Sequence, residues 1–166
     1  MQKAWSKTSE GLYSFESDGI AAGSMRIEHA TMDRKAQCIF GDQEFEFKRV
    51  GFWRSTLEIR AKDGTLLGIL QPEKWYANTW ILDYAGESYH LAVRNNPMAE
   101  WVFQKDGKDV LAYSLDSKDG QIHVRMSSSS STTEPMLDYL LWYFFVPIAM
   151  ENMGDTLSFL LLLSAA

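Results

Sequence analysis

Cysteine is almost absent from this chain of 166 residues, in which Cys38 is the only one. A single thiol cannot form an intramolecular disulfide, so the core must hold the fold, and the composition fits a reducing compartment. The first 24 residues also lack the apolar run that a secretory signal needs after Lys3 and Lys7. Both absences predict a cytoplasmic protein.

Positive charge is also scarce. The chain has 16 basic and 22 acidic residues, a formal net charge of −6. This balance gives no electrostatic basis for non-specific nucleic-acid binding, and we predict no nucleic-acid partner. Residues 133–166 hold four acidic and no basic side chains, whereas residues 22–65 hold eight basic and seven acidic ones. Attraction to an anionic surface is therefore predicted to come from the first half of the chain.

Signatures of catalysis and metal binding are missing too. The sequence has no G-x-S-x-G, P-loop or dinucleotide-binding pattern. His29, His90 and His123 lie far apart, without the spacing of zinc ligands. Cys38 has no adjacent basic residue to activate it, so we interpret it as a buried structural thiol. We predict no metal, no cofactor, no catalytic residues and no enzymatic activity, with an enzyme of unidentified class as an alternative.

Aromatic residues, in contrast, are abundant: six Trp, seven Tyr and nine Phe. From residue 12 to residue 127 they fall in short alternating segments divided by turn signals, which favours strands joined as hairpins. In residues 44–48, Phe45 and Phe47 alternate with charged side chains. About ten consecutive, mainly antiparallel strands are expected. The turn signals are Gly41-Asp42, Asp63-Gly64, Ala85-Gly86, Asn95-Asn96-Pro97, Asp106-Gly107 and Asp119-Gly120.

A helix is predicted after the serine run at residues 127–131. Ser131 and Glu134 have the spacing of a capping box, and Pro135 suits a first helical turn. Gly154 is placed to end the helix, which should therefore run over about 134–153.

This helix is apolar on every side, so it must be surrounded. Met136 to Met150 contains twelve large apolar or aromatic side chains and one charge, Asp138. A bilayer is one alternative, but a span needs about 20 apolar residues and this run ends at Glu151. The protein interior is the other, because a barrel of more than about eight strands has room for a helix in its lumen. Pro147 removes one N–H and crowds the carbonyl of Tyr143, which predicts a kink.

We therefore predict a mainly β fold, a closed antiparallel barrel of about 10–12 strands around a buried, apolar C-terminal helix. Residues 1–21 are expected to be an N-terminal extension with a candidate first strand, 22–153 the barrel with its helix, and 154–166 an apolar tail. The tail has three alternatives: a last strand, a second helix or an interfacial anchor. It is also a candidate homodimer contact. No transmembrane span is predicted.

Asp138 has two alternative roles. A carboxylate near the first helical turn stabilises the helix through the macrodipole. In a dry interior it could instead be a functional carboxylate with a raised pKa. We favour the structural role.

A β meander that ends in one wholly apolar helix resembles the tubby C-terminal-domain-like superfamily, which includes LURP-one-related proteins and phospholipid scramblases. The densest part of the resemblance runs from Leu137-Asp138-Tyr139-Leu140-Leu141 to Ile148-Ala149-Met150-Glu151, with a similar hairpin from Leu57 to Gly68. The resemblance implies a closed barrel of about twelve antiparallel strands around a buried helix, without established enzymatic activity. Tubby domains bind phosphoinositides through basic residues on the barrel wall, but no motif here carries those positions over.

One cluster combines basic and aromatic residues. Lys48, Arg49 and Arg54 flank the pair Phe52-Trp53, a mixture that suits an anionic membrane interface. We predict Lys48, Arg49, Trp53 and Arg54 as lipid-binding residues. The alternative is an ordinary solvated wall whose bases are neutralised by three nearby acids, Glu44, Glu46 and Glu58.

The expected function is thus a non-enzymatic binding or scaffold barrel. It would recognise an anionic lipid headgroup or a protein partner, in the cytoplasm and peripherally at the membrane. A carrier barrel for a small apolar ligand is the main alternative, and it requires an empty lumen.

Overall fold

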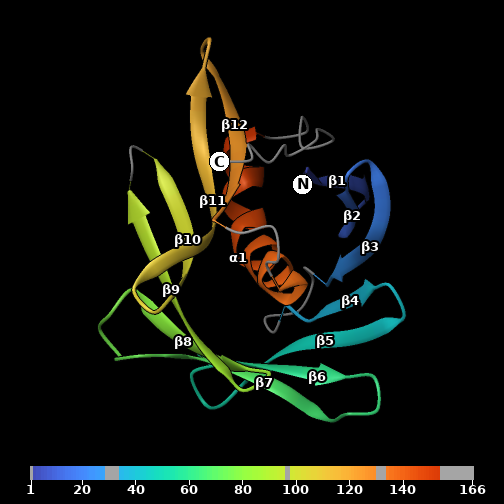
Figure 1. Cartoon of the computed structure of the whole chain (residues 1–166), viewed down its shortest axis with the longest axis vertical. Helices are drawn as coiled ribbons and strands as arrows, with labels where there is room; N and C mark the ends of the chain where they lie inside the picture. Colours follow the sequence, from blue (N-terminus) through green and yellow to red (C-terminus); the bar gives the residue numbers. More distant parts are fainter. Residues whose placement is uncertain (1, 29–33, 96–97, 130–133, 154–166) are drawn as a thin grey trace.

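The structure, a computed structural model, describes residues 2–28, 34–95, 98–129 and 134–153. Each strand pairs antiparallel with the next one along the chain, and the resulting sheet curls around a single helix (Figure 1). The elements are β1 Lys3–Ser9, β2 Leu12–Ser17, β3 Ile20–Ile27, β4 Ala36–Phe40, β5 Gln43–Val50, β6 Thr56–Ala61, β7 Leu66–Pro72, β8 Thr79–Tyr84, β9 Glu87–Asn95, β10 Ala99–Lys105, β11 Lys108–Lys118, β12 Gln121–Ser128 and α1 Pro135–Met153.

The fold class predicted from the sequence is confirmed: a mainly β, antiparallel, nearly closed barrel of twelve strands with one C-terminal helix. Tight turns connect many neighbouring strands. Ala85-Gly86, Asp106-Gly107 and Asp119-Gly120 each have two successive positive φ angles, the conformation of the primed hairpin turns that match the twist of the strands. Asn96 and Pro97 of another predicted turn lie outside the described residues.

The N-terminal segment departs from the prediction. Residues 1–21 are expected to be an extension with a candidate first strand, whereas they hold two complete strands, β1 and β2, of the same sheet, and the expected boundary falls inside β3. Asp18-Gly19 makes the β2–β3 turn, with φ angles of 52° and 76°. The first strand is anchored by a fully buried Trp5, which belongs to the common core of the barrel and packs on Tyr139 and Trp142 of the helix.

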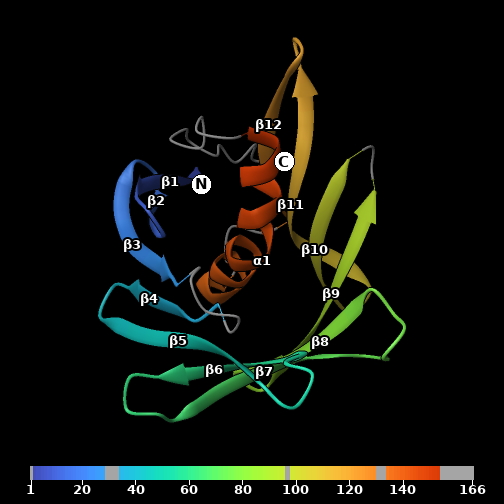
Figure 2. The same cartoon turned by 180° about the vertical axis from the view of Figure 1, so that it is seen from behind.

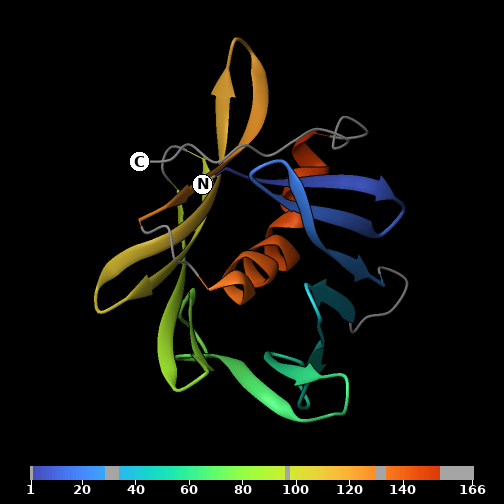
Figure 3. The ribbon, with the colours of Figure 1, turned by 45° about the vertical axis from the view of Figure 1, so that its right-hand side comes forward.

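Helix α1 fills the lumen. The strands of the sheet pass round the helix (Figure 3). Every residue from Met136 to Tyr143 is buried, and the ring of Trp142 stacks on that of Trp5 at 5.3 Å. The Tyr139 hydroxyl donates a hydrogen bond to the Ile39 carbonyl at 2.6 Å. It passes so close to Gly23 that a Cβ there would overlap with it, which explains glycine in the middle of β3. Within the described part of the chain, no helix combines the length and apolar character needed to cross a bilayer.

The two edge strands, β1 and β12, lie on either side of the upper part of α1 in Figure 2, and no backbone ladder joins them among the described residues. Buried side chains connect this region instead. Lys3 Nζ lies 2.5 Å from Asp138 Oδ2, the Tyr113 hydroxyl donates to Asp138 Oδ1 at 2.9 Å, and Trp5 Nε1 donates to the Tyr113 oxygen at 3.0 Å. The network joins β1 and β11 to the helix, so the two ends of the sheet are connected through side chains of α1 rather than through backbone hydrogen bonds.

Asp138 is therefore a structural carboxylate, and its role is an ion pair rather than the helix dipole alone. Burial raises its pKa, whereas the Lys3 ammonium and the Tyr113 hydroxyl act in the opposite direction. Because a buried charge is tolerated only when it is paired, Lys3 and Asp138 depend on each other.

Pro147 has a specific consequence inside α1. It supplies no N–H to the carbonyl of Tyr143, four residues earlier. The Arg34 guanidinium donates to that carbonyl at 2.7 Å and lies 4.7 Å from the centre of the Tyr143 ring. Burial lowers the pKa of Arg34. A side chain from the β3–β4 connection thus replaces the missing helical donor.

Candidate functional site

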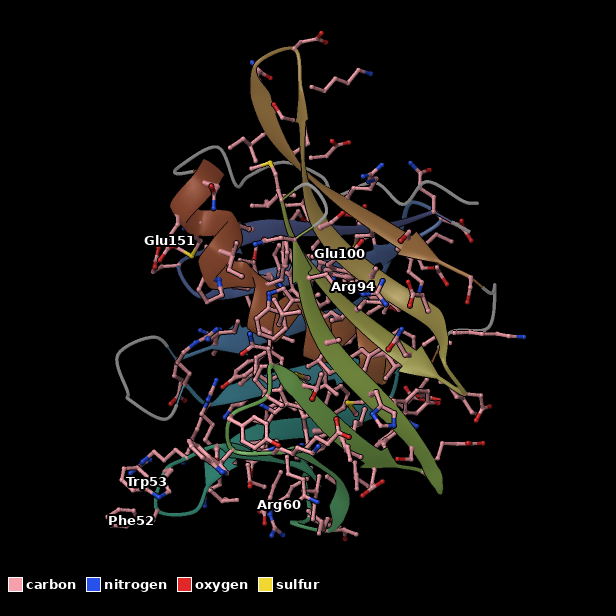
Figure 4. The ribbon with its side chains drawn as sticks, turned by 90° about the vertical axis from the view of Figure 1, so that its left-hand side faces the viewer. Phe52, Trp53, Arg60, Arg94, Glu100 and Glu151 are labelled. Carbon is pink, nitrogen blue, oxygen red and sulfur yellow. The ribbon has the colours of Figure 1, made fainter. Side chains whose placement is uncertain are left out.

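The candidate site lies at one end of the barrel, where loop 51–55 joins β5 to β6 and loop 73–78 joins β7 to β8. Four aromatic side chains on these loops reach into solvent: Phe52 is 88%, Trp53 83%, Trp75 93% and Tyr76 67% exposed. Phe52 and Trp53 project from the body of the barrel (Figure 4). We call these two loops and their side chains the aromatic end.

Tight turns in the two loops place these rings outside the sheet. Gly51 and Arg54 both have positive φ, and the Arg54 N–H donates to the Gly51 carbonyl at 3.2 Å. In the second loop, the Ala77 N–H donates to the Lys74 carbonyl at 3.1 Å. Both turns satisfy their own backbone, so the aromatic side chains at their tips are not needed for packing.

The basic residues of the sequence prediction lie here in two different settings. Lys48 is exposed on β5, whereas Arg49 is partly buried. Arg49 Nε donates to the Tyr143 hydroxyl at 3.2 Å, and its Nη1 donates to the Arg54 carbonyl at 3.4 Å. Arg49 therefore links loop 51–55 to the central helix, while Lys48 is a surface charge.

A cavity of about 400 Å³ opens between the two loops. Arg49, Trp53 and Arg54 line it, and Lys48 does not. The structure thus brings together three of the four predicted residues around one cavity and places the fourth on the neighbouring wall. The cavity is lined further by Lys74, Trp75, Trp80, Trp101 and Phe144.

Sequence reasoning missed several of these residues. Lys74-Trp75-Tyr76 repeats the basic and aromatic mixture of Phe52-Trp53-Arg54, so a signal for the second loop was present. Trp80 and Trp101 gave no such signal, because each lies within a strand and looks like a core residue.

The acids expected to neutralise the basic cluster are largely engaged elsewhere. Glu58 Oε2 accepts from Arg60 Nε at 2.7 Å, and Glu44 lies 2.8 Å from Lys62 Nζ. Loop 73–78 carries one acid, Glu73, which accepts from the Thr79 hydroxyl. The aromatic end therefore keeps a local positive charge on a protein whose net charge is negative.

The other candidate groups lie apart from this site. Cys38 is buried, as expected of a structural thiol, and burial raises its pKa well above the ordinary value. His90 and His123 are exposed on different strands, and His29 lies outside the described residues. The predicted tail, 154–166, and its candidate dimer contact also lie outside them.

Two further cavities, of about 420 and 460 Å³, lie at the opposite end of the barrel, beside the start of α1. Both are lined by Phe45, Tyr84 and Met136. Their charged lining is mainly acidic and comprises Asp42, Glu44, Lys62, Asp63 and Glu134. The cavities at the two ends of the barrel therefore differ in the sign of their charged lining.

Comparisons of this chain with protein-family models, with curated proteins and with solved structures found no match. The argument for function accordingly rests on the geometry of the aromatic end.

Proposed function

We propose that this protein is a non-enzymatic binding domain that docks on the cytoplasmic surface of an anionic membrane through its aromatic end. The observation that carries the proposal is the group of four aromatic rings, 67–93% exposed, on two adjacent loops. Tryptophan and tyrosine favour the interface between headgroups and acyl chains, where the ring is shielded from water and its polar atom stays hydrated.

Charge gives the proposed docking its selectivity. Arg54 and Lys74 lie on the same loops as the exposed rings, Lys48 lies on β5 near the first loop, and Glu44 and Glu58 of the wall are paired with Lys62 and Arg60. A basic residue next to an anionic leaflet contributes about 1 kcal/mol. Three of them correspond to about 3 kcal/mol, or roughly a hundredfold in affinity.

The interior argues against the carrier alternative, because α1 occupies the space that an apolar ligand would need. Membership of the tubby-like superfamily is part of this proposal, supported by the arrangement of a twelve-stranded barrel around one apolar helix. A fold alone does not specify a ligand, so the proposal depends on the aromatic end.

Vesicle cosedimentation tests the proposal. The intact protein should pellet with vesicles of phosphatidylcholine and phosphatidylserine and stay in solution with phosphatidylcholine alone. Lys48→Ala/Arg54→Ala/Lys74→Ala should weaken binding roughly a hundredfold. Because the Debye length is about 8 Å at physiological ionic strength and shrinks as salt is added, about 0.5 M salt should remove most of the binding.

Matched controls separate this site from general effects of charge and hydrophobicity. Lys62→Ala/Lys105→Ala/Lys108→Ala removes the same net charge from turns at the opposite end of the barrel and should leave binding unchanged. Ile20→Ser removes another exposed apolar side chain, also at that end, and should likewise have no effect. Equal losses in both triple variants would contradict docking through the aromatic end. No binding to anionic vesicles at low salt would contradict membrane docking and favour a protein partner.

A further inference from the structure

Four of the six tryptophans of the chain converge on the cavity of the aromatic end. Trp53 comes from loop 51–55, Trp75 from loop 73–78, Trp80 from β8 and Trp101 from β10. The volume of about 400 Å³ lies within the range of about 300–1,000 Å³ that is typical of small-molecule sites. We call this space the tryptophan cavity.

One wall of the tryptophan cavity is a stack of flat rings. Trp80 and Trp101 lie 5.7 Å apart with planes inclined by 19°, and Trp101 and Phe144 lie 5.3 Å apart with planes inclined by 8°. Leu57 and Leu70 add aliphatic surface. Such a wall offers apolar contact area with little conformational entropy to lose on binding.

The charged lining of the tryptophan cavity is entirely basic. Arg49, Arg54 and Lys74 contribute to it, and none of the described lining residues is acidic. Aromatic cages without such bases are typical sites for quaternary ammonium groups. Three cations around the same rings would repel an ammonium ligand and attract an anion.

Arg49 is held in position before any ligand arrives. Its Nε donates to the Tyr143 hydroxyl and its Nη1 to the Arg54 carbonyl, and its guanidinium carbon lies 5.8 Å from the centre of the Phe144 ring. The positive charge is therefore placed directly beside the aromatic stack. A preorganised cation next to an apolar wall is complementary to a molecule with an anionic head and an apolar body.

We infer that the tryptophan cavity binds one single-chain anionic amphiphile, with its carboxylate or phosphate among Arg49, Arg54 and Lys74 and its apolar chain against Trp80 and Trp101. This inference deepens the proposed function and rests on it, because both use Trp53, Arg54, Lys74 and Trp75. The inference adds a second kind of binding to the proposed docking: the cavity binds one amphiphile molecule, whereas the loop tips contact the surface of a membrane.

The two activities share some residues but can be separated at side chains that belong to only one of them. Phe52 and Tyr76 are exposed at the loop tips and do not line the tryptophan cavity. Ser55 lines the cavity and is itself exposed, so a larger side chain there can fill the space without disturbing the core.

Calorimetric titration with three ten-carbon probes, each kept below its micelle concentration, tests the inference. Decanoate should bind saturably to the intact protein, at least roughly tenfold more tightly than decanol or decyltrimethylammonium, because charge-assisted contacts exceed the 1.4 kcal/mol that a tenfold change represents. Ser55→Trp should abolish decanoate binding, and the matched Ser55→Ala should retain it. Equal binding of all three probes, no saturable binding, or binding that Ser55→Trp leaves intact would overturn the inference.

Vesicle cosedimentation of the same proteins distinguishes this inference from the proposed function. Ser55→Trp should still pellet with anionic vesicles. The double variant Phe52→Ser/Tyr76→Ser should no longer bind the vesicles but should still bind decanoate. Decanoate binding without vesicle binding would support the cavity and contradict membrane docking. Vesicle binding without decanoate binding would support docking and overturn the cavity ligand.

Discussion

The lumen of the barrel and the aromatic end are both rich in aromatic side chains, which are buried in the lumen and exposed to solvent at the aromatic end. In the lumen, Trp5, Tyr139 and Trp142 are at most 1% exposed and pack on one another. At the aromatic end, Trp53 and Trp75 are 83% and 93% exposed. Tyr139 and Trp142 belong to α1 and Trp5 packs against them, whereas Trp53 and Trp75 lie on loops that are exposed to solvent. Aromatic density alone therefore does not separate core from binding surface; the position of α1 does.

The largest expected effect is in the lumen. Leu141 is fully buried, so Leu141→Asp places a charge inside the packed lumen, and its cost should be comparable with a typical stability of about 5–15 kcal/mol. We expect no folded protein, as judged by near-ultraviolet circular dichroism. Phe144→Asp is the sharper comparison: Phe144 is only partly buried and lies beside Arg49, so this variant should fold with reduced stability. A folded Leu141→Asp would refute the filled barrel.

The buried ion pair should give the next largest effect. Lys3→Met leaves the Asp138 carboxylate buried without its cation, which should cost about 3–5 kcal/mol in urea unfolding. Lys3→Met/Asp138→Leu removes both charges and should recover most of that loss. If the double variant is no more stable than the single one, the pair is not the interaction that connects β1 to α1.

A smaller effect is expected at alkaline pH. Burial raises the pKa of Tyr13 to about 12. The unfolded chain therefore ionises at lower pH than the folded one, and this group's contribution to stability is lost as the pH rises from about 10 through 12. Tyr13→Phe should weaken that dependence, by on the order of 1 kcal/mol between these limits. Urea midpoints across the pH series measure it, with Tyr76→Phe at the aromatic end as a control that should follow the wild type.

The smallest effect on stability should come from the aromatic end. Trp53→Phe/Trp75→Phe replaces two exposed indoles and should change the free energy of unfolding by less than about 0.5 kcal/mol. It should also remove the fluorescence that shifts to shorter wavelength when the wild type meets anionic vesicles. Trp5→Phe, in the lumen, should retain that shift and lose stability. A marked destabilisation by the surface pair would mean that the loops pack on the fold.

Much of the architecture follows from local signals. The helix begins at Pro135 and ends at Met153, within a residue of the expected range, because Pro135 suits a first turn and the apolar residues follow it without a break. Ser131 of the predicted capping box lies outside the described residues. Asp18-Gly19 is the same kind of turn signal as Asp119-Gly120, so β2 and β3 were within reach of the same reasoning. We did not predict the Asp18-Gly19 turn because we interpreted residues 1–21 as an extension.

The site could be predicted only in part, because it depends on contacts between distant segments. Loop 51–55 carries its basic and aromatic residues together, and this cluster was found. Trp80 and Trp101 join it only because β8 and β10 both pair with β9, an arrangement that no short window reveals. Lys3 and Asp138 are 135 positions apart, and their pairing likewise depends on where the barrel brings its first strand.

The order in which the barrel and its contents occur along the chain has a consequence for synthesis. All twelve strands precede α1, so a ribosome releases the complete wall before the helix that fills it. Until residues 135–153 emerge, the inward-facing side chains of the sheet have nothing to cover them, and the nascent protein presents an apolar trough of the kind that chaperones bind. A message truncated shortly before Pro135 should therefore yield a chain that aggregates rather than a smaller folded domain.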